Sequence, residues 1–200
     1  SKEEGLKEFG FSRELPVVFV VGGSRGARKL NESVMLLAKK CVGEKSFQML
    51  HMTGDTQYDD MLKMYNNEDI HQDTGYLRVM PYIYNMPYAL AASDIVISRC
   101  GASTLSEITA LGKPCILIPY PYATDNHQEY NARALEKNGA AIVILDRDLN
   151  ADILYNEVAD MLVKPEKIKQ MAERSRILGR TDAANSITMI AERLVQNKKA

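Results

Sequence analysis

Cysteine is scarce in this chain of 200 residues, and its distribution argues against two kinds of site. Cys41, Cys100 and Cys115 lie far apart, and none of them belongs to a C-x-x-C pair. A structural zinc site or a disulfide framework would need closely spaced or paired cysteines. We therefore expect neither, and a reducing, cytoplasmic compartment suits the chain.

The chain also lacks an excess of charge of either sign and any long apolar run. Its 25 Lys and Arg residues against 26 Asp and Glu residues give a net charge of −1, and 46% of its residues are hydrophobic. This composition is typical neither of a nucleic-acid-binding tail nor of a disordered chain. No apolar stretch approaches the roughly 20 residues that cross a bilayer, and residues 1–5 lack the apolar core of a signal peptide. We expect a soluble globular chain without a nucleic-acid partner.

Strand-like and helix-like patterns alternate along the chain. This alternation predicts an α/β fold, a Rossmann-like doubly wound parallel sheet with helices on both faces. The expected strands cover residues 17–21, 47–52, 77–79, 94–98, 115–119 and 141–145. The expected helices cover residues 29–40, 56–65, 86–92, 103–111, 127–137, 151–162, 165–178 and 182–196. We expect the last three helices to wrap the sheet.

The sequence indicates one domain preceded by a short connector. Residues 1–15 are polar and charged, and we expect them to form a connector that leads into the first strand. Residues 16–200 contain no repeat, low-complexity tract or internal linker. They are therefore expected to form one doubly wound domain.

The first candidate for a ligand site follows the apolar run Val17–Val21, in the segment Gly22-Gly23-Ser24-Arg25-Gly26-Ala27. Glycines at this point let backbone amides approach an anion at the start of a helix, so the segment favours a phosphate. It is neither the G-x-G-x-x-G dinucleotide fingerprint nor a P-loop, and a tight connection without a ligand remains the alternative. Arg25 and Arg28 are candidates to pair with phosphate, although a solvated arginine is the preferred interpretation for Arg28.

The second candidate opens the helix expected after residues 94–98. Gly101, Ala102, Ser103 and Thr104 would present free amides and two hydroxyls to a diphosphate. Glu107 is four residues after Ser103 and so lies on the same helix face, within reach of a ribose diol. The alternative is that Ser103 is only an N-cap and Glu107 only a solvated residue.

The third candidate is the polar run Asp125-Asn126-His127-Gln128. Carboxylate, amide and imidazole groups in such density suit the hydroxyls of a sugar. A helix-start or surface histidine is the alternative for His127. Asp125 and His127 have no third ligand at a familiar spacing, so we expect no metal here.

These three segments together resemble the MurG family of N-acetylglucosamine transferases, over residues 3–200 and specifically its C-terminal, donor-binding half. The resemblance implies half of a GT-B glycosyltransferase that holds UDP-N-acetylglucosamine (UDP-GlcNAc). It implies transfer of GlcNAc, with inversion, to the C4 hydroxyl of MurNAc in lipid I, which forms lipid II at the cytoplasmic face of the membrane.

The resemblance also assigns roles to individual residues. It implies that Ser24 and its neighbours Gly23, Arg25 and Gly26 contact the diphosphate together with residues 101–104, and that Glu107 holds the ribose. It implies that the backbone of Ile83 reads the uracil edge, and that Gln128, with His127 and Asp125 beside it, contacts the GlcNAc hydroxyls. Cys100 and His127 depart from residues common in the family, and the second departure leaves the sugar contacts open.

The resemblance implies that other functions belong to an N-terminal acceptor domain, from which residues 1–15 would be the connector. These are the general base, the lipid I site and most of the membrane contact, so we expect no catalytic residue in this chain and no turnover by it alone. No cofactor is expected. Two alternatives remain open, another GT-B lipid glycosyltransferase of the diacylglycerol glucosyltransferase type and a stand-alone donor-binding subunit of a two-subunit GlcNAc transferase.

Overall fold

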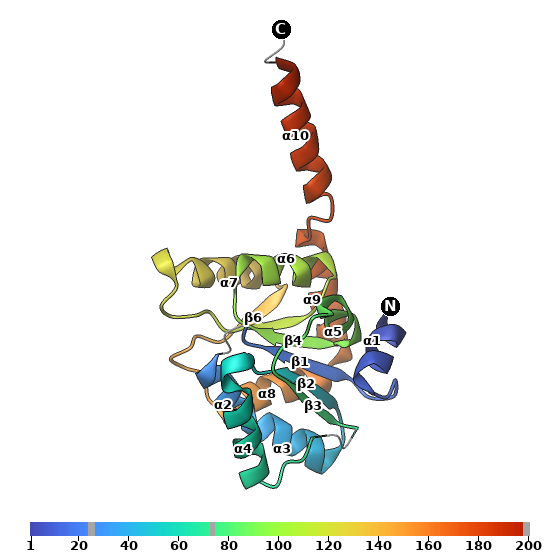
Figure 1. The fold of residues 1–200 in the computed structure, drawn as a ribbon, viewed down its shortest axis with the longest axis vertical. Coiled ribbons are helices and arrows are strands. Elements are labelled where there is room, and N and C mark those ends of the chain that lie inside the picture. The colour runs from blue at the N-terminus through green and yellow to red at the C-terminus, as the bar shows by residue number, and fades with distance from the viewer. Residues whose placement is uncertain (24–26, 73–74, 198–200) are drawn as a thin grey trace.

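A computed structural model of the chain describes residues 1–23, 27–72 and 75–197 and contains a central parallel sheet (Figure 1). The sheet has six strands in the order β3-β2-β1-β4-β5-β6, and every neighbouring pair is parallel. The strands are β1 (Val17–Val21), β2 (Gln48–Met52), β3 (Leu77–Met80), β4 (Ile95–Ser98), β5 (Cys115–Leu117) and β6 (Ala141–Val143). The predicted Rossmann-like fold is confirmed, and all six expected strands form within a few residues of their expected ends.

Strand β1 lies at the centre of the sheet because its five residues are apolar on both faces. All five of them, Val17, Val18, Phe19, Val20 and Val21, are buried. The strand pairs with β2 on one side and with β4 on the other. An unbroken apolar run is what a parallel strand covered by helices on both faces requires.

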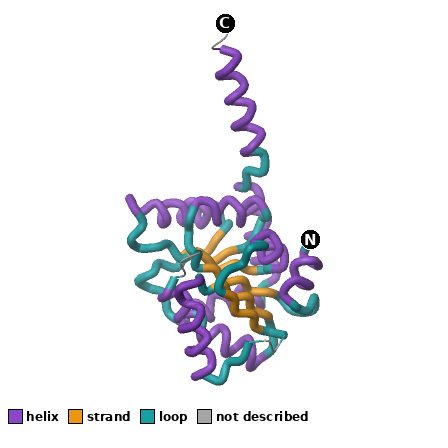
Figure 2. The backbone as a smooth tube through the Cα atoms, in the orientation of Figure 1, coloured by secondary structure: helices purple, strands orange, loops and turns teal. Residues whose placement is uncertain are grey.

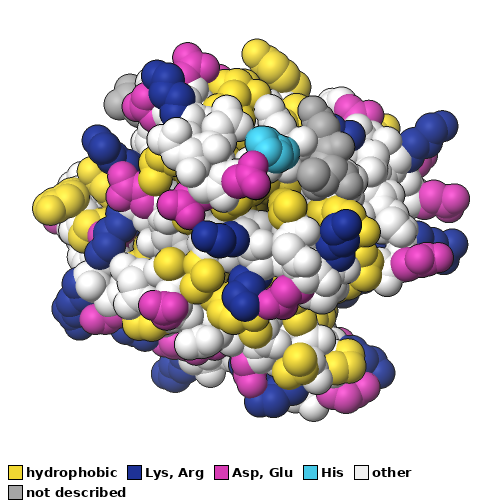
Figure 3. All heavy atoms as spheres, turned by 90° about the horizontal axis from the view of Figure 1, so that it is seen from below, with side chains coloured by type: hydrophobic (Ala, Val, Ile, Leu, Met, Phe, Trp, Pro, Cys, Tyr) yellow, Lys and Arg dark blue, Asp and Glu magenta, His cyan; other side chains and the backbone are white. Residues whose placement is uncertain are grey.

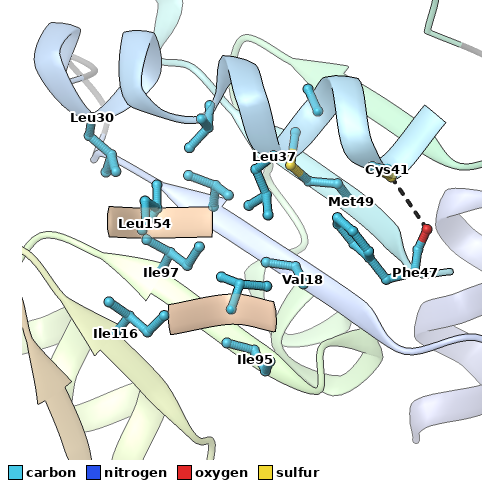
Figure 4. Close-up of a cluster of buried hydrophobic side chains, with 14 of the residues drawn as sticks. Val18, Leu30, Leu37, Cys41, Phe47, Met49, Ile95, Ile97, Ile116 and Leu154 are labelled. Carbon is cyan, nitrogen blue, oxygen red and sulfur yellow. Dashed lines mark hydrogen bonds between the residues drawn. The ribbon is translucent and has the colours of Figure 1, made fainter. Parts of the chain in front are cut away.

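Two apolar clusters cover the two faces of the sheet, since successive side chains of a strand point in opposite directions. Val18 and Val20 belong to the cluster shown in Figure 4, which four helices cover: α2 (Arg28–Ser33), α3 (Met35–Glu44), α4 (Tyr58–Asn67) and α8 (Ala151–Leu162). Val17, Phe19 and Val21 belong to the other cluster, which four helices cover: α1 (Lys2–Phe9), α5 (Met86–Ala92), α6 (Ala102–Ala110) and α7 (His127–Lys137). Figure 2 accordingly shows the strands enclosed between helical layers.

The helices follow the expected pattern except that one expected helix is divided and one further helix, α1, forms at the start of the chain. They are α1 (Lys2–Phe9), α2 (Arg28–Ser33), α3 (Met35–Glu44), α4 (Tyr58–Asn67), α5 (Met86–Ala92), α6 (Ala102–Ala110), α7 (His127–Lys137), α8 (Ala151–Leu162), α9 (Pro165–Leu178) and α10 (Ala183–Asn197). The single helix expected over residues 29–40 is divided at Val34 into α2 and α3. Short 3₁₀ turns, Asp55–Gln57 and Thr124–Asn126, precede α4 and α7.

Helix α1 lies within residues 1–15, where the sequence indicated no helix. Ser1 and Glu4 form a reciprocal capping box at its start. Leu6 and Phe9 are buried in the core, and α1 packs closely against α5 at Gly5, where an added Cβ would lie 2.4 Å from the Tyr88 carbonyl oxygen. This segment is therefore packed against the domain.

The expectation that the last three helices wrap the sheet is wrong for α10. Helices α8 and α9 contribute buried residues such as Leu154 and Met171, whereas α10 projects away from the sheet (Figure 1). The backbone at Gly179 is extended (φ −69°, ψ 138°) and passes so close to α6 that an added Cβ would lie 2.6 Å from the Thr109 carbonyl oxygen. The chain leaves the core at this point, and the apolar residues Ile187, Met189, Ile190, Leu194 and Val195 are exposed.

The surface is mixed in charge. On the face seen in Figure 3, basic and acidic side chains are interspersed, in keeping with the net charge of −1. Within the described ranges, none of the helices combines the length and the apolar composition needed to cross a membrane.

Candidate functional site

A cleft of about 600 Å³ opens at the carboxyl edge of the sheet. It lies where the chain connections reverse direction, between β1 and β4, which is where open α/β sheets bind ligands. We call it the switch-point cleft. Its described lining residues come from five segments and are Gly22, Gly23, Ala27, Arg28, Lys29, Arg99, Tyr120, Pro121, Tyr122, Gln128 and Asp146.

The glycine-rich turn forms one wall of this cleft. Gly23 has φ +94°, a conformation that side chains other than glycine rarely adopt, and a Cβ there would meet nothing within 4 Å. The glycine is therefore required by the backbone conformation and leaves open space beside it. Ser24, Arg25 and Gly26, which the sequence also assigns to this site, lie outside the described residues.

Helix α6 begins beside the cleft, directly after Arg99 and Cys100. Its N-cap is Gly101, so the interpretation of Ser103 as the N-cap is wrong. A glycine offers no side chain to the amides of Ala102, Ser103 and Thr104, which leaves the positive end of the helix dipole available to an anion. Ala102, Ser103 and Glu107 are exposed and Thr104 is half-buried, but residues 101–107 do not line the cleft itself.

Gln128 joins the two loops that flank the cleft. Its Oε1 accepts hydrogen bonds from the N–H of Cys100 and the N–H of Tyr120, both at 3.0 Å. These donors belong to the loops after β4 and β5. Since the carboxamide oxygen is engaged, the Nε2 amino group is the part of Gln128 that can donate to a ligand.

Asp125 lies in the short turn before α7, and His127 is the first residue of α7; both are exposed, and neither lines the cleft. Asp125 (φ +50°) and Asn126 (φ +52°) both adopt the left-handed conformation, which aspartate and asparagine reach more readily than other residues with side chains. The Nδ1 of His127 lies 2.7 Å from the Thr124 carbonyl oxygen. Because a carbonyl only accepts, Nδ1 donates in this contact, and in the neutral imidazole Nε2 is the acceptor.

Ile83 lies in the loop after β3. Its side chain is only 3% exposed and belongs to the second apolar cluster. Burial of the side chain fixes the position of the backbone in this loop. The side chain itself is thus part of the core, and any ligand contact at this position must come from the peptide group.

Charged residues that the sequence did not single out meet at the far side of the cleft. Arg99 Nη2 lies 2.7 Å from Asp146 Oδ1, and Arg99 Nη1 donates to the carbonyls of Ile118 and Pro119 at 3.2 and 3.1 Å. Lys29 Nζ donates to the carbonyl oxygen of Asp146. Arg99 and Asp146 follow the strands β4 and β6 closely, and that placement was the signal that could have identified them.

Positive charge predominates in the lining of the cleft. Among its described lining residues, Arg28, Lys29 and Arg99 are opposed only by Asp146.

The Cys100 thiol beside the cleft is not a nucleophile. Burial raises the pKa of this thiol to about 12, so it stays protonated at neutral pH. Within the part of the chain that the structure describes, no three His, Cys, Asp or Glu side chains come together as a metal site.

Comparisons with known proteins identify the family to which the chain is similar. Residues 17–188 match the family model of the glycosyltransferase family 28 C-terminal domain. The chain is 42% identical over 200 residues to a UDP-N-acetylglucosamine--N-acetylmuramyl-(pentapeptide) pyrophosphoryl-undecaprenol N-acetylglucosamine transferase of Acetivibrio thermocellus, and covers 53% of it. It is 45% identical over 191 residues to the protein of that name from Caldanaerobacter subterraneus, with 96% of this chain and 52% of the relative covered.

Solved structures share the fold. A crystal structure of Acinetobacter baumannii MurG matches with a TM-score of 0.77 and 26% identity, over 94% of this chain and 53% of that chain. A UDP-GlcNAc 2-epimerase of Neisseria meningitidis matches with a TM-score of 0.65 at 16% identity, over 98% of this chain and 48% of that chain. The chain spans about half the length of the curated relatives it matches.

Proposed function

The chain belongs to the glycosyltransferase family 28 C-terminal domain family, and from this premise we propose that it binds the nucleotide-sugar donor of a GlcNAc transferase. Its fold is that of the C-terminal half of a GT-B glycosyltransferase. The observation that carries the proposal is the position of the switch-point cleft, between the glycine turn after β1 and the start of α6. The proposed donor is UDP-GlcNAc.

In this proposal the donor lies along the carboxyl edge of the sheet. The diphosphate is held by the turn at Gly23, including Ser24, Arg25 and Gly26, and by the first-turn amides of α6. These backbone amides need no side-chain movement to meet an anion. The cations of the cleft strengthen the attraction.

Other polar groups bind the ribose, the uracil and the sugar of the donor. Glu107 lies one turn into α6 and accepts hydrogen bonds from the ribose hydroxyls. The peptide group of Ile83 pairs with the uracil edge. The Nε2 of Gln128 donates to a sugar hydroxyl, and the exposed groups of His127 and Asp125 complete the sugar contacts.

The proposed reaction moves GlcNAc, with inversion, to the C4 hydroxyl of MurNAc in lipid I and forms lipid II. The chain would supply stabilisation of the departing UDP, on which negative charge builds as the bond to the sugar breaks. We assign the general base, the lipid I site and most of the membrane contact to the half of the relatives that this chain does not match. Holding the two substrates between two halves would orient the hydroxyl toward the sugar carbon.

Calorimetric titration of the chain with UDP-GlcNAc, UDP-glucose and UDP tests the proposal. We expect binding of UDP-GlcNAc, with weaker binding of UDP-glucose. Glu107→Ala and Gln128→Ala should each weaken binding about fivefold or more, because each leaves a polar group of the ligand unpaired.

Matched control variants are Glu173→Ala and Gln170→Ala, which remove the same residue types from the exposed surface of α9. Both should bind UDP-GlcNAc as tightly as the wild type. The proposal fails if the wild-type chain binds no uridine nucleotide, or if the control variants lose as much affinity as the site variants. Preference for UDP-glucose would favour the diacylglycerol glucosyltransferase type.

A further inference from the structure

A buried polar network lies beneath the switch-point cleft and is centred on His51 of β2. Its Nδ1 lies 2.7 Å from the hydroxyl oxygen of Tyr65 on α4, and its Nε2 lies 3.1 Å from Oδ1 of Asn31 on α2. His51 and Asn31 are fully buried, and Tyr65 is nearly so. Polar side chains without access to water depend on such partners, since an unpaired group would be costly.

The hydrogen-bond directions in this network follow from Asn31. Its Nδ2 lies 2.8 Å both from the Thr53 carbonyl oxygen and from Oε1 of Gln57, and both of these oxygens accept. Oδ1 of Asn31 therefore faces His51, and Nε2 of His51 must donate to it. Full burial disfavours the charged ring, so His51 is neutral and carries its proton on Nε2, and Nδ1 accepts from the Tyr65 hydroxyl.

Asn31 connects this network to the wall of the cleft. It lies in the first turn of α2, and its N–H donates to the carbonyl oxygen of Ala27 at 2.8 Å. Ala27, Arg28 and Lys29 line the cleft at this point. The start of α2 has no side-chain cap, because its N-cap is Ala27. The side chain of Asn31 is thus a buried anchor for this first turn.

We propose that His51 is a positioning residue, which through its Nε2–H hydrogen bond to Asn31 holds the first turn of α2, and with it the cleft wall at Ala27, Arg28 and Lys29, in place for the binding of the donor. The inference rests on the proposed function for the identity of the ligand. The bond to Tyr65, by contrast, joins β2 to α4 and contributes to stability without reaching the cleft. The two nitrogens of one imidazole therefore have separable roles.

Two substitutions separate these roles. The carboxamide of glutamine ends near the position of Nε2, so His51→Gln can still donate to Asn31 but loses the acceptor for Tyr65. The carboxamide of asparagine ends near Nδ1, so His51→Asn can still accept from Tyr65 but does not reach Asn31. Tyr65→Phe is the matched control, because it removes only the hydroxyl that meets Nδ1.

The measurements are the Kd for UDP and the thermal midpoint of each variant of the full chain. We expect the UDP affinity of His51→Gln and Tyr65→Phe to stay within about threefold of wild type. His51→Asn should lose about tenfold or more in UDP affinity. All three variants should lower the thermal midpoint. Equal losses of affinity in the Gln and Asn variants, or losses that merely follow the midpoints, would overturn the inference. So would wild-type affinity in His51→Asn.

Two further readouts keep the test decisive if a variant fails to fold or UDP does not bind. Long-range ¹H–¹⁵N spectra of the wild-type chain should show the proton of His51 on Nε2, and a proton on Nδ1 or on both nitrogens would contradict the inference. If the wild type binds no UDP, the proposed function fails, but amide exchange at Asn31 still tests the anchor. Exchange about tenfold faster in His51→Asn than in His51→Gln supports it, and equal exchange overturns it.

Discussion

The side-chain oxygen of Gln128 accepts a hydrogen bond from the backbone N–H of Cys100 at 3.0 Å, which ties α7 to the loop that begins α6. The same oxygen accepts from the N–H of Tyr120. One carboxamide therefore sets the distance between two loops and still offers an amino group to the cleft. In the proposed function, the oxygen holds the two loops and the amino group meets the donor.

This division predicts the effect of Gln128→Glu. A carboxylate can accept both backbone hydrogen bonds, so we expect the thermal midpoint to stay close to that of wild type. It cannot donate, and its charge would oppose a diphosphate, so the Kd for UDP-GlcNAc should rise about tenfold or more. Calorimetry and thermal denaturation of the same sample measure the two effects. Wild-type affinity in this variant would show that Nε2 does not meet the ligand.

His51 predicts a pH dependence of stability. Burial lowers its pKa to about 3 from an ordinary value of 6.5. Below pH 6.5 the unfolded chain binds a proton that the folded chain excludes, so the free energy of unfolding should decrease as the pH falls through this window. The stabilisation from the excluded proton is fully present above pH 6.5. By pH 5 the free energy of unfolding should be about 2 kcal/mol lower on account of His51.

The measurement compares urea denaturation of wild type and His51→Gln between pH 5 and pH 8. The acidic and basic groups that both proteins share cancel in the difference. The wild type should lose about 2 kcal/mol more than the variant between pH 7 and pH 5. Parallel pH profiles would mean that His51 titrates normally in the folded state.

Close packing of α1 on α5 predicts opposite effects of two glycine substitutions. Gly5→Ala would place a Cβ 2.4 Å from the Tyr88 carbonyl oxygen and 2.9 Å from the Ala92 nitrogen, so one helix must shift, at a cost of about 1–3 kcal/mol. Gly43→Ala on α3 meets nothing within 4 Å and should stabilise by up to about 1 kcal/mol. Chemical denaturation measures both, and a neutral Gly5→Ala would argue against tight docking of α1.

The exposure of α10 predicts that it contributes little to the stability of the domain. A chain that ends at residue 181 should keep its thermal midpoint within about 2 °C, since isolated helices of this length are marginal in water. Met171→Ala on α9 is the contrasting variant, because Met171 is only 6% exposed and its loss should cost about 2–5 kcal/mol. A truncated chain that is as destabilised as Met171→Ala would show that α10 packs on the domain.

The fold could be predicted from sequence to the extent that local patterns dictate it. The apolar run Val17–Val21 forms β1 with the same bounds. An unbroken apolar run of this length indicates a strand buried on both faces without any knowledge of tertiary contacts. The division of the expected helix at Val34 and the departure of α10 at Gly179 could not be predicted. The departure of α10 depends on a contact with another element, the close approach of Gly179 to Thr109 on α6, which local patterns do not show.

The candidate site was predicted in part. Gly23 and Gln128 were both named as candidates, and the structure brings them to one cleft because parallel strands collect their loops at one edge of the sheet. Arg99, Lys29 and Asp146 were missed as a group, since their mutual contacts join segments that are far apart in sequence. The sequence around a charged residue at the end of a strand does not show which distant residue it will contact. The roles of Glu107 and His127 toward a ligand stay predictions.

Strand β1 also affects how the cleft behaves over time. It is paired on both sides, and its side chains are buried, so its amide protons should exchange with solvent only when the whole domain unfolds. The backbone that enters the cleft at Gly22 thus keeps its place during the local openings that release loops and helix ends. An arriving ligand would meet at least one wall that is already assembled.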